Sequence, residues 1–105
     1  MDNSEFISLA DTALERIERS IEASGVDVDC SMASDGVLEI ECADGSKIIV
    51  NRHAAAQEIW VAARSGGFHF RWSGEEWRDT RSRQELLTSL AVLLSAQAGE
   101  AVTLR

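Results

Sequence analysis

The segment spanning residues 45–77 constrains the fold most strongly, because it repeats the two-residue period of β-strands. Within residues 47–52, 57–63 and 68–72, large apolar side chains alternate with other residues, which is the pattern of strands with one buried face. A Ser-Gly-Gly turn signal at residues 65–67 separates two of these segments. The pattern predicts neighbouring strands of one sheet, with one face that another layer must cover.

The residues before this segment extend the predicted sheet. Residues 26–32 and 37–42 alternate apolar and polar or acidic side chains. The Asp-Gly pairs at residues 35–36 and 44–45 are typical of tight hairpin turns, and residues 76–79 are expected to form a short edge strand. Strands joined by such turns favour an antiparallel meander.

One amphipathic helix is expected before the strands and another after them. The first is apolar at every third or fourth position up to a stop signal at Gly25. Either Asn3 or Ser4 can cap its N-terminus. Residues 82–85 have the sequence of a capping box, and a leucine-rich helix follows them up to Gly99.

Two amphipathic helices cannot bury their apolar stripes alone. We therefore expect an α+β fold, a two-layer sandwich whose N- and C-terminal helices pack on one face of a five- to seven-stranded antiparallel sheet. With 105 residues, the chain is expected to form a single domain, residues 1–105, whose core needs neither disulfides nor metal. Cys30 and Cys42 lie in strand-like segments and lack a CxxC spacing, so we expect buried, reduced thiols.

Charge is distributed unevenly along the chain. Residues 1–44 hold twelve acids against two arginines, a net charge of −10, whereas residues 45–105 hold six acids against eight Lys and Arg, a net charge of +2. The acidic half disfavours nucleic acid as a partner, because phosphate contacts need cations, and favours cations or a basic protein surface. No segment has the roughly 20 apolar residues of a membrane span, and the acidic N-terminus lacks the features of a signal peptide. We expect a cytoplasmic protein that does not contact membranes.

Motifs of common enzyme classes are missing. The chain contains no G-x-S-x-G, P-loop or G-x-G-x-x-G sequence. Cys30 is expected to face the core, while His53 and His69 face away from it, so a Cys–His nucleophile pair is not expected. We therefore expect a protein that is not an enzyme.

Carboxylates gather along one side of the first predicted helix and continue into the strand that follows. Spacings of three and four residues stack such side chains on one helix face. This acidic ridge consists of Asp11, Glu15, Glu18, Glu22, Asp27 and Asp29. Its oxygen ligands suit hard cations such as iron, magnesium or calcium, with weak and solvent-exposed binding because no His or Cys takes part. Acids on a helix can also form a merely solvated face, but six along one edge favour a functional surface.

The uncovered face of the predicted sheet carries a second candidate site. By alternation, this face carries Asn51, Glu58, Trp60, His69 and Arg71, which point away from the helices. An exposed Trp in a polar patch is a common anchor of protein contacts, so we expect this face to bind a partner. His69 on its own is also compatible with an ordinary surface histidine.

Several segments of the chain resemble the bacterial frataxin family. The motifs are GSKIIVNR at residues 45–52, IWVA at 59–62 and GGFHF at 66–70, with further similarity at residues 4–6, 9–11, 27–30 and 97–100. The resemblance covers essentially the whole chain, in order and at matching length. It implies the same fold of two helices on one antiparallel sheet.

The resemblance also implies an iron-binding accessory protein of iron–sulfur cluster assembly, which regulates the cysteine desulfurase–scaffold complex, supplies iron to it, or both. In that family the acidic ridge binds iron weakly, as Fe²⁺ or Fe³⁺, and meets a basic surface of the desulfurase, while the open sheet face contacts the desulfurase–scaffold assembly. Carried over by position, the partner-binding residues are Glu18, Glu22, Asn51, Trp60 and His69. The expected state is a monomer that iron can drive into oligomers.

Two departures from the family pattern leave the number and affinity of iron sites open. Bacterial relatives often have paired acids at the end of the first helix, but Arg19 and Ala23 follow Glu18 and Glu22 here. Ile7 occupies a position where a histidine can occur.

Two alternative functions remain open. A metal-independent interaction module would use the acidic ridge only to dock a basic partner. A ferroxidase-like activity would need a closed, well-ligated iron site, which an open ridge without histidine does not offer.

Overall fold

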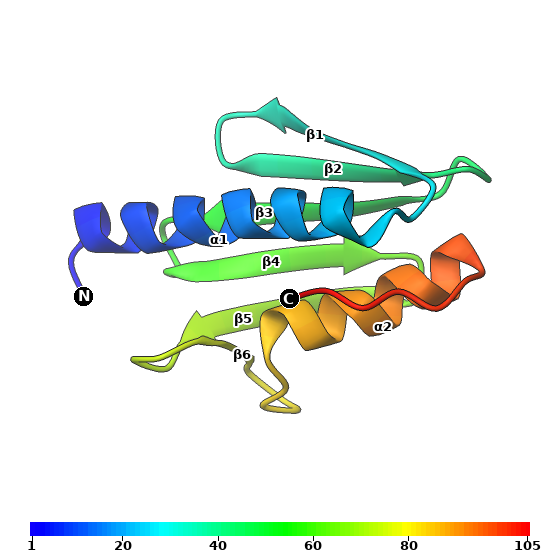
Figure 1. The fold of residues 1–105 in the computed structure, drawn as a ribbon. Coiled ribbons are helices and arrows are strands. Elements are labelled where there is room, and N and C mark those ends of the chain that lie inside the picture. The colour runs from blue at the N-terminus through cyan, green and yellow to red at the C-terminus, as the bar shows by residue number, and fades with distance from the viewer.

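The computed structural model describes residues 1–105, and the chain folds into two layers (Figure 1). A six-stranded sheet forms one layer, and both helices lie on the same face of it. In chain order the elements are α1 (Asn3–Ser24), β1 (Val28–Ser34), β2 (Val37–Cys42), β3 (Lys47–His53), β4 (Glu58–Ala63), β5 (Gly66–Trp72), β6 (Trp77–Asp79) and α2 (Leu86–Ala98). The predicted α+β sandwich is confirmed. Neither helix is long and apolar enough to cross a bilayer.

The sheet is an antiparallel meander in which each strand pairs with its neighbours in the sequence, from β1 at one edge to β6 at the other. Gly36 and Gly45 form the two predicted Asp-Gly turns with φ angles of 75° and 87°, a conformation that glycine adopts without strain. Six strands agree with the expected range.

The core lies between the sheet and the helices and consists of 20 buried apolar residues. Alternate positions of the strands supply Leu38, Ile40, Cys42, Ile48, Val50, Ile59, Val61, Phe70 and Trp77. The helices supply Phe6, Ala10, Leu14, Ile17, Ile21, Leu86, Leu87, Leu90 and Leu94. The opposite face of the sheet has no covering layer (Figure 1), so the side chains on it are free to meet a partner.

Helix α1 begins one residue earlier than the predicted cap. Asp2 is the N-cap, because its carboxylate accepts a hydrogen bond from the Glu5 amide at 2.8 Å, so the expected cap at Asn3 or Ser4 is wrong. Gly25 ends the helix in the left-handed conformation, with a φ of 74°, as predicted.

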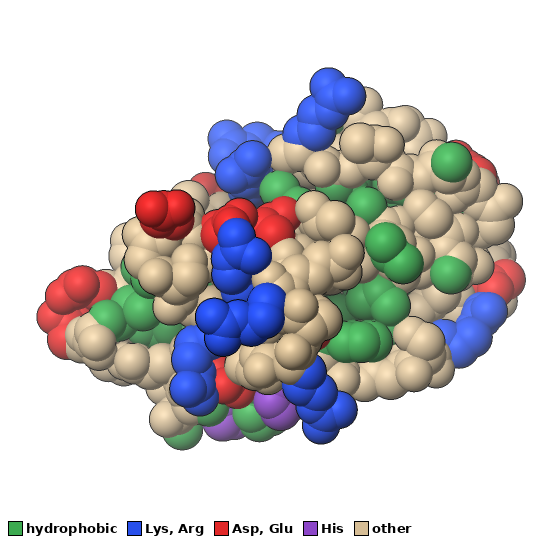
Figure 2. All heavy atoms as spheres, turned by 90° about the horizontal axis from the view of Figure 1, so that it is seen from below, with side chains coloured by type: hydrophobic (Ala, Val, Ile, Leu, Met, Phe, Trp, Pro, Cys, Tyr) green, Lys and Arg blue, Asp and Glu red, His purple; other side chains and the backbone are tan.

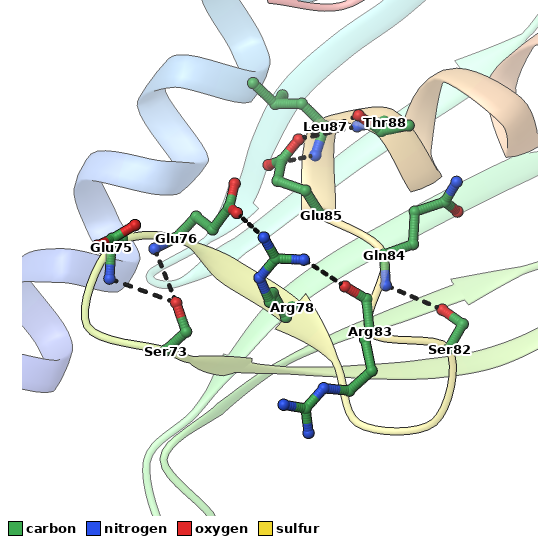
Figure 3. A network of polar contacts seen from close by, with 10 residues as sticks. All are labelled: Ser73, Glu75, Glu76, Arg78, Ser82, Arg83, Gln84, Glu85, Leu87 and Thr88. Carbon is green, nitrogen blue, oxygen red and sulfur yellow. Dashed lines mark hydrogen bonds and ion pairs between the residues drawn. The ribbon is translucent and has the colours of Figure 1, made fainter.

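The predicted capping box before α2 is also wrong. Arg83 has a φ of 69°, which is incompatible with a helical turn beginning at this point. Glu85 is the N-cap and accepts hydrogen bonds from the amides of Leu87 and Thr88 at 2.8 and 3.1 Å (Figure 3). Ser82 instead accepts from the Gln84 amide within the preceding loop at 3.2 Å.

Strand β1 begins at Val28, two residues later than predicted. The Val28 amide donates to the Val26 carbonyl at 3.0 Å, so the chain turns at Asp27 before it becomes extended. Both cysteines are free thiols: Cys42 is buried, as expected, but Cys30 is only half-buried, because β1 is an edge strand.

Arg52 of β3 links its strand to α1 and to the β1–β2 turn through ion pairs. Its guanidinium donates to Asp11 of α1 at 2.6 Å and to Asp35 of the β1–β2 turn at 2.8 Å. A Cβ atom on Gly36 would lie 2.6 Å from Arg52 Nη1, so glycine is required at this position both for its positive φ and for space.

Replacing Gly36 by alanine is therefore expected to lower the free energy of unfolding by about 1–3 kcal/mol, through backbone strain and displacement of Arg52. Chemical denaturation measures this change. Gly45→Ala is the matched control, because Gly45 also has a positive φ but its Cβ would meet nothing within 4 Å. Equal losses for the two variants would contradict the role given to Arg52.

Candidate docking face and acidic ridge

The uncovered sheet face brings the predicted partner-binding residues of three strands into one row. Asn51 of β3 lies directly opposite Trp60 of β4, and Trp60 lies directly opposite His69 of β5. Cross-strand neighbours on one face of a sheet are in side-chain contact. The three positions therefore form one continuous surface, which we call the docking face.

Trp60 is not the freely exposed side chain that alternation suggested. Its indole is stacked between two imidazoles: the ring centroid of His53 lies 3.7 Å away with an interplanar angle of 12°, and that of His69 lies 4.6 Å away with an angle of 10°. Trp60 is consequently half-buried. Both broad faces of the indole are occupied, so the tryptophan presents its edge to solvent and the histidines present their outer faces.

The Glu58 carboxylate fixes the position of the stacked rings through hydrogen bonds. Its Oε1 accepts a hydrogen bond from Trp60 Nε1 at 2.9 Å and lies 3.4 Å from His69 Nδ1, while its Oε2 accepts from Arg71 Nη2 at 2.8 Å and from Nε at 3.1 Å. Glu58 is only 6% exposed although it lies on the uncovered face. Burial alone raises the pKa of this carboxyl, but the hydrogen bonds from Trp60 and Arg71 and the nearby positive charge outweigh burial and leave the pKa lowered.

Two further side chains of the docking face are fixed by local hydrogen bonds. His53 Nδ1 accepts from the Ala56 amide at 3.2 Å, which sets the orientation of the imidazole that packs on Trp60. Asn51 Nδ2 donates to the Arg52 carbonyl at 3.3 Å, and its amide oxygen accepts no hydrogen bond from the protein. The docking face is ordered before any partner arrives.

Sequence reasoning did not name His53, Glu58 or Arg71 as partner-binding residues. Alternation placed Glu58 and Arg71 on the correct side of the sheet, but gave no reason to join them to Trp60. Grouping these residues requires the pairing register of β3, β4 and β5, which sets His53 opposite Glu58 and Glu58 opposite Arg71. A carboxylate two positions before an outward-facing Trp is a signal that could have pointed to the contact.

The acidic ridge is divided into separate groups. Glu18 and Glu22 line a hollow of about 350 Å³ together with Cys30, between the end of α1 and β1. Asp27 and Asp29 line another hollow, of about 220 Å³, together with Glu41, which lies directly opposite Asp29 across the β1–β2 pair. Glu41 adds a carboxylate that is not one of the six residues of the predicted ridge.

The remaining ridge residues stand apart from these two groups. Asp11 is bound to Arg52, so a metal ion would have to compete with a guanidinium for its carboxylate. Glu15 is exposed and forms no ion pair. No group of three or more His, Cys, Asp or Glu side chains is arranged to hold a metal ion.

The reactivity of Cys30 depends on the hollow that it lines together with Glu18. Partial burial, followed by repulsion from the Glu18 carboxylate, raises the pKa of the thiol from 9.0 to about 11. At pH 8 the thiolate fraction of Cys30, and hence its alkylation rate, is expected to be about a hundredfold below that of an unperturbed thiol. Iodoacetamide labelling with peptide mapping, which separates Cys30 from Cys42, measures this rate.

Replacing Glu18 by glutamine is expected to accelerate the labelling of Cys30, because removing the negative charge lowers the pKa of the thiol. Glu15→Gln removes an acid elsewhere on α1 and is the control. Identical labelling rates in both variants would show that Glu18 does not act on Cys30.

The comparisons with known proteins agree with this structure. The Frataxin-like domain model matches residues 1–100. The iron-sulfur cluster assembly protein CyaY of Dechloromonas aromatica is 62% identical over 105 residues, which is 100% of both chains. CyaY of Cupriavidus necator is 49% identical and covers 99% of this chain and 96% of its own.

Solved structures lead to the same family. Frataxin from Psychromonas ingrahamii superposes with a TM-score of 0.90 at 37% identity, over 98% of this chain and 97% of its own. Trimeric frataxin from Saccharomyces cerevisiae, with a TM-score of 0.66 at 23% identity over 89% of this chain and 78% of its own, shares the fold. The resemblance seen in the sequence is thereby confirmed, and the chain belongs to the frataxin-like domain family.

Proposed function

We propose that this chain is a non-catalytic accessory protein of iron–sulfur cluster assembly, which docks on the cysteine desulfurase–scaffold complex in the cytoplasm and acts as a monomer. The closely similar proteins of Dechloromonas aromatica and Cupriavidus necator are iron-sulfur cluster assembly proteins by name. Their similarity extends over essentially the full length of both chains.

The observation that carries the proposal is the prearranged docking face. His53, Trp60 and His69 are stacked on one another, and Glu58 and Arg71 hold the stack in place. Side chains that are already ordered lose little conformational entropy on binding, so more of the contact energy contributes to affinity. An interfacial Trp in such a setting is a typical hot spot.

The acidic ridge supports the proposal by its charge. The acidic ridge reaches the face of the sheet that carries the docking face: Asp29 of β1 and the Glu41 opposite it on β2 lie on the same sheet face as Trp60. Carboxylates at this edge would steer a basic surface of the desulfurase towards the docking face.

Iron would bind to the ridge weakly and at the surface. Carboxylate oxygens suit Fe²⁺ and Fe³⁺, but the ridge offers pairs of acids, at Glu18 with Glu22 and at Asp27 with Asp29, and no enclosed set of ligands. Iron held this way can be passed on to the assembly complex, or can alter how the ridge meets the desulfurase. Iron bridging between such pairs on different copies would drive oligomers.

Binding of the chain to the purified desulfurase–scaffold complex, measured by isothermal titration calorimetry, tests the proposal. Trp60→Ala is expected to weaken binding about 30-fold or more, the loss of a typical hot spot. Thr88→Ala is the matched control, because Thr88 is exposed on α2, in the helix layer, and lines no pocket with a residue of the docking face. Unchanged affinity of Trp60→Ala would refute the assignment of the docking face.

A second candidate function is a metal-independent interaction module, and the lack of any grouped metal ligands favours it. In that case the acids serve only to attract a basic partner. Titration with Fe²⁺ under anaerobic conditions separates the two functions. Saturable changes in the NMR signals beside Glu18, Glu22 and Asp29 support iron binding, whereas changes that only follow ionic strength support the metal-independent module.

A further inference from the structure

We propose that a hollow between α1 and the C-terminal tail binds a small polyanion with two or more carboxylate or phosphate groups. The hollow measures about 750 Å³ and is lined by the last turns of α1 and by residues 100–105. The tail runs along the helix layer, on the side of the molecule away from the docking face (Figure 1). Small-molecule sites typically measure about 300–1,000 Å³, and this one shares no residue with the acidic ridge.

Three arginines from two segments line the hollow. Arg16 and Arg19 are three residues apart on α1, which places both on the same side of the helix. Arg105 comes from the tail. All three are exposed, and none forms an ion pair with a carboxylate.

The lack of ion pairs distinguishes these arginines from the cations on and beside the sheet. Every Lys and Arg of the sheet has a carboxylate partner: Lys47 pairs with Glu39, Arg52 with Asp11 and Asp35, Arg64 with Asp44, Arg71 with Glu58, and Arg78 with Glu76. Glu15 and Glu22 lie about one turn from Arg19 but do not bind it. In a chain of net charge −8, three arginines that line one hollow and form no ion pair favour an anion supplied from outside.

The remaining unpaired arginines, Arg81 and Arg83, lie in the loop between β6 and α2. This loop belongs to the face seen in Figure 2, where Lys and Arg side chains gather near the middle. Neither residue lines the hollow. They therefore provide a matched control of the same residue type and charge.

Hydrogen bonds fix the tail against α1 and so preserve the shape of the hollow. The Arg105 amide donates to Ser20 Oγ at 2.6 Å, the Val102 amide donates to Ser95 Oγ at 2.9 Å, and Leu104 is buried. Ala101 and Thr103 also line the hollow, and their amide N–H groups donate to no group of the protein. Two free backbone donors thus accompany the three guanidinium groups.

These donors define the class of ligand. Guanidinium groups bind carboxylates and phosphates through paired hydrogen bonds. The Glu100 carboxylate lines the same hollow and places one negative charge beside the arginines. A singly charged ligand therefore gains little binding affinity, because the carboxylate of the hollow repels it. A ligand with several anionic groups can bind more than one arginine at once.

Titration of the metal-free chain with citrate or with pyrophosphate, followed by amide NMR, tests the site. Saturable shifts are expected for residues 16–24 and 100–105, against sodium chloride at matched ionic strength. Arg16→Gln combined with Arg19→Gln is expected to weaken binding about tenfold or more, because two charge-assisted contacts are lost. Arg81→Gln combined with Arg83→Gln removes the same charge and is expected to retain wild-type affinity.

The two titrants separate the possible sources of the anion. Saturation by citrate alone assigns a polycarboxylate, saturation by pyrophosphate alone assigns a phosphorylated ligand, and either result supports the site. Shifts no larger than those caused by sodium chloride would overturn the proposal. Equal loss of affinity in the two double variants would also overturn it, because net charge and not the hollow would then govern the response.

Discussion

Replacing Glu58 by alanine is expected to weaken docking on the desulfurase–scaffold complex about tenfold or more and to lower the free energy of unfolding by about 1–3 kcal/mol. The variant leaves Trp60 Nε1 without its acceptor and releases Arg71. Loss of a partner from a buried hydrogen bond costs about this much, and Arg71 itself, 67% exposed, is readily hydrated. The indole and the two imidazoles are then free to take other rotamers, so binding must order them again.

Glu58→Gln is the informative control. The amide keeps an oxygen that can accept from Trp60 Nε1, but it lacks the charge that binds Arg71. We expect its docking affinity to lie closer to wild type than that of Glu58→Ala. Calorimetric binding and denaturation of both variants measure the two effects. Wild-type docking by Glu58→Ala would show that the stack is not held by this carboxylate.

The pH dependence of the stack follows from the same carboxylate. The pKa of Glu58 is lowered in the folded protein, so its contribution to stability is present above its unfolded-state pKa and is lost as the pH falls through the folded-state pKa. The fluorescence of the three tryptophans should therefore change on acidification, because protonated Glu58 no longer carries the charge that binds Arg71 and strengthens the hydrogen bond from Trp60 Nε1, and Trp60→Phe should lack this component. An acid transition that is identical in the two proteins would contradict the link.

Reversing the charge of Glu18 and Glu22 to lysine is expected to have the other large effect. The double variant changes the net charge of the chain from −8 to −4 and places two cations in the hollow beside Cys30. At low ionic strength, association with a basic partner should slow by about tenfold or more, because electrostatic steering reverses at this edge. Iron binding at this pair should be lost.

Glu75→Lys combined with Glu100→Lys changes the net charge by the same amount at other positions. Both residues are exposed and form no ion pair. Stopped-flow association at two salt concentrations and iron titration compare the two double variants. A similar slowing in both would mean that net charge, and not the ridge, steers the partner.

The strands and their inward faces could be predicted because both follow from a local period. Ile59 and Val61 are buried and Trp60 faces the other way, as alternation requires. The helix starts were missed because Asp2 and Glu85 cap through side-chain geometry that competes with equally suitable neighbours. Such choices depend on the backbone around the cap, as the positive φ of Arg83 illustrates.

Helical spacing and strand alternation anticipated which faces the candidate site residues occupy, but not the contacts that these residues make. Asp11 forms an ion pair with Arg52, which lies 41 residues away in the sequence. No local spacing predicts that pairing. The stack of Trp60 with His53 and His69 likewise depends on register and rotamers across three strands. The ridge residues Glu15, Glu18, Glu22, Asp27 and Asp29, and the docking residues Asn51, Trp60 and His69, stay predictions as functional sites until binding is measured.

The most direct test of the account is the rate of sulfide production by the desulfurase with its scaffold, measured with and without iron. Adding this protein is expected to change the rate, and the change is expected to depend on iron. Trp60→Ala is expected to leave the rate close to that of the complex alone, while Thr88→Ala is expected to act like wild type. A full wild-type response to Trp60→Ala would contradict the claim that the open sheet face docks the assembly complex.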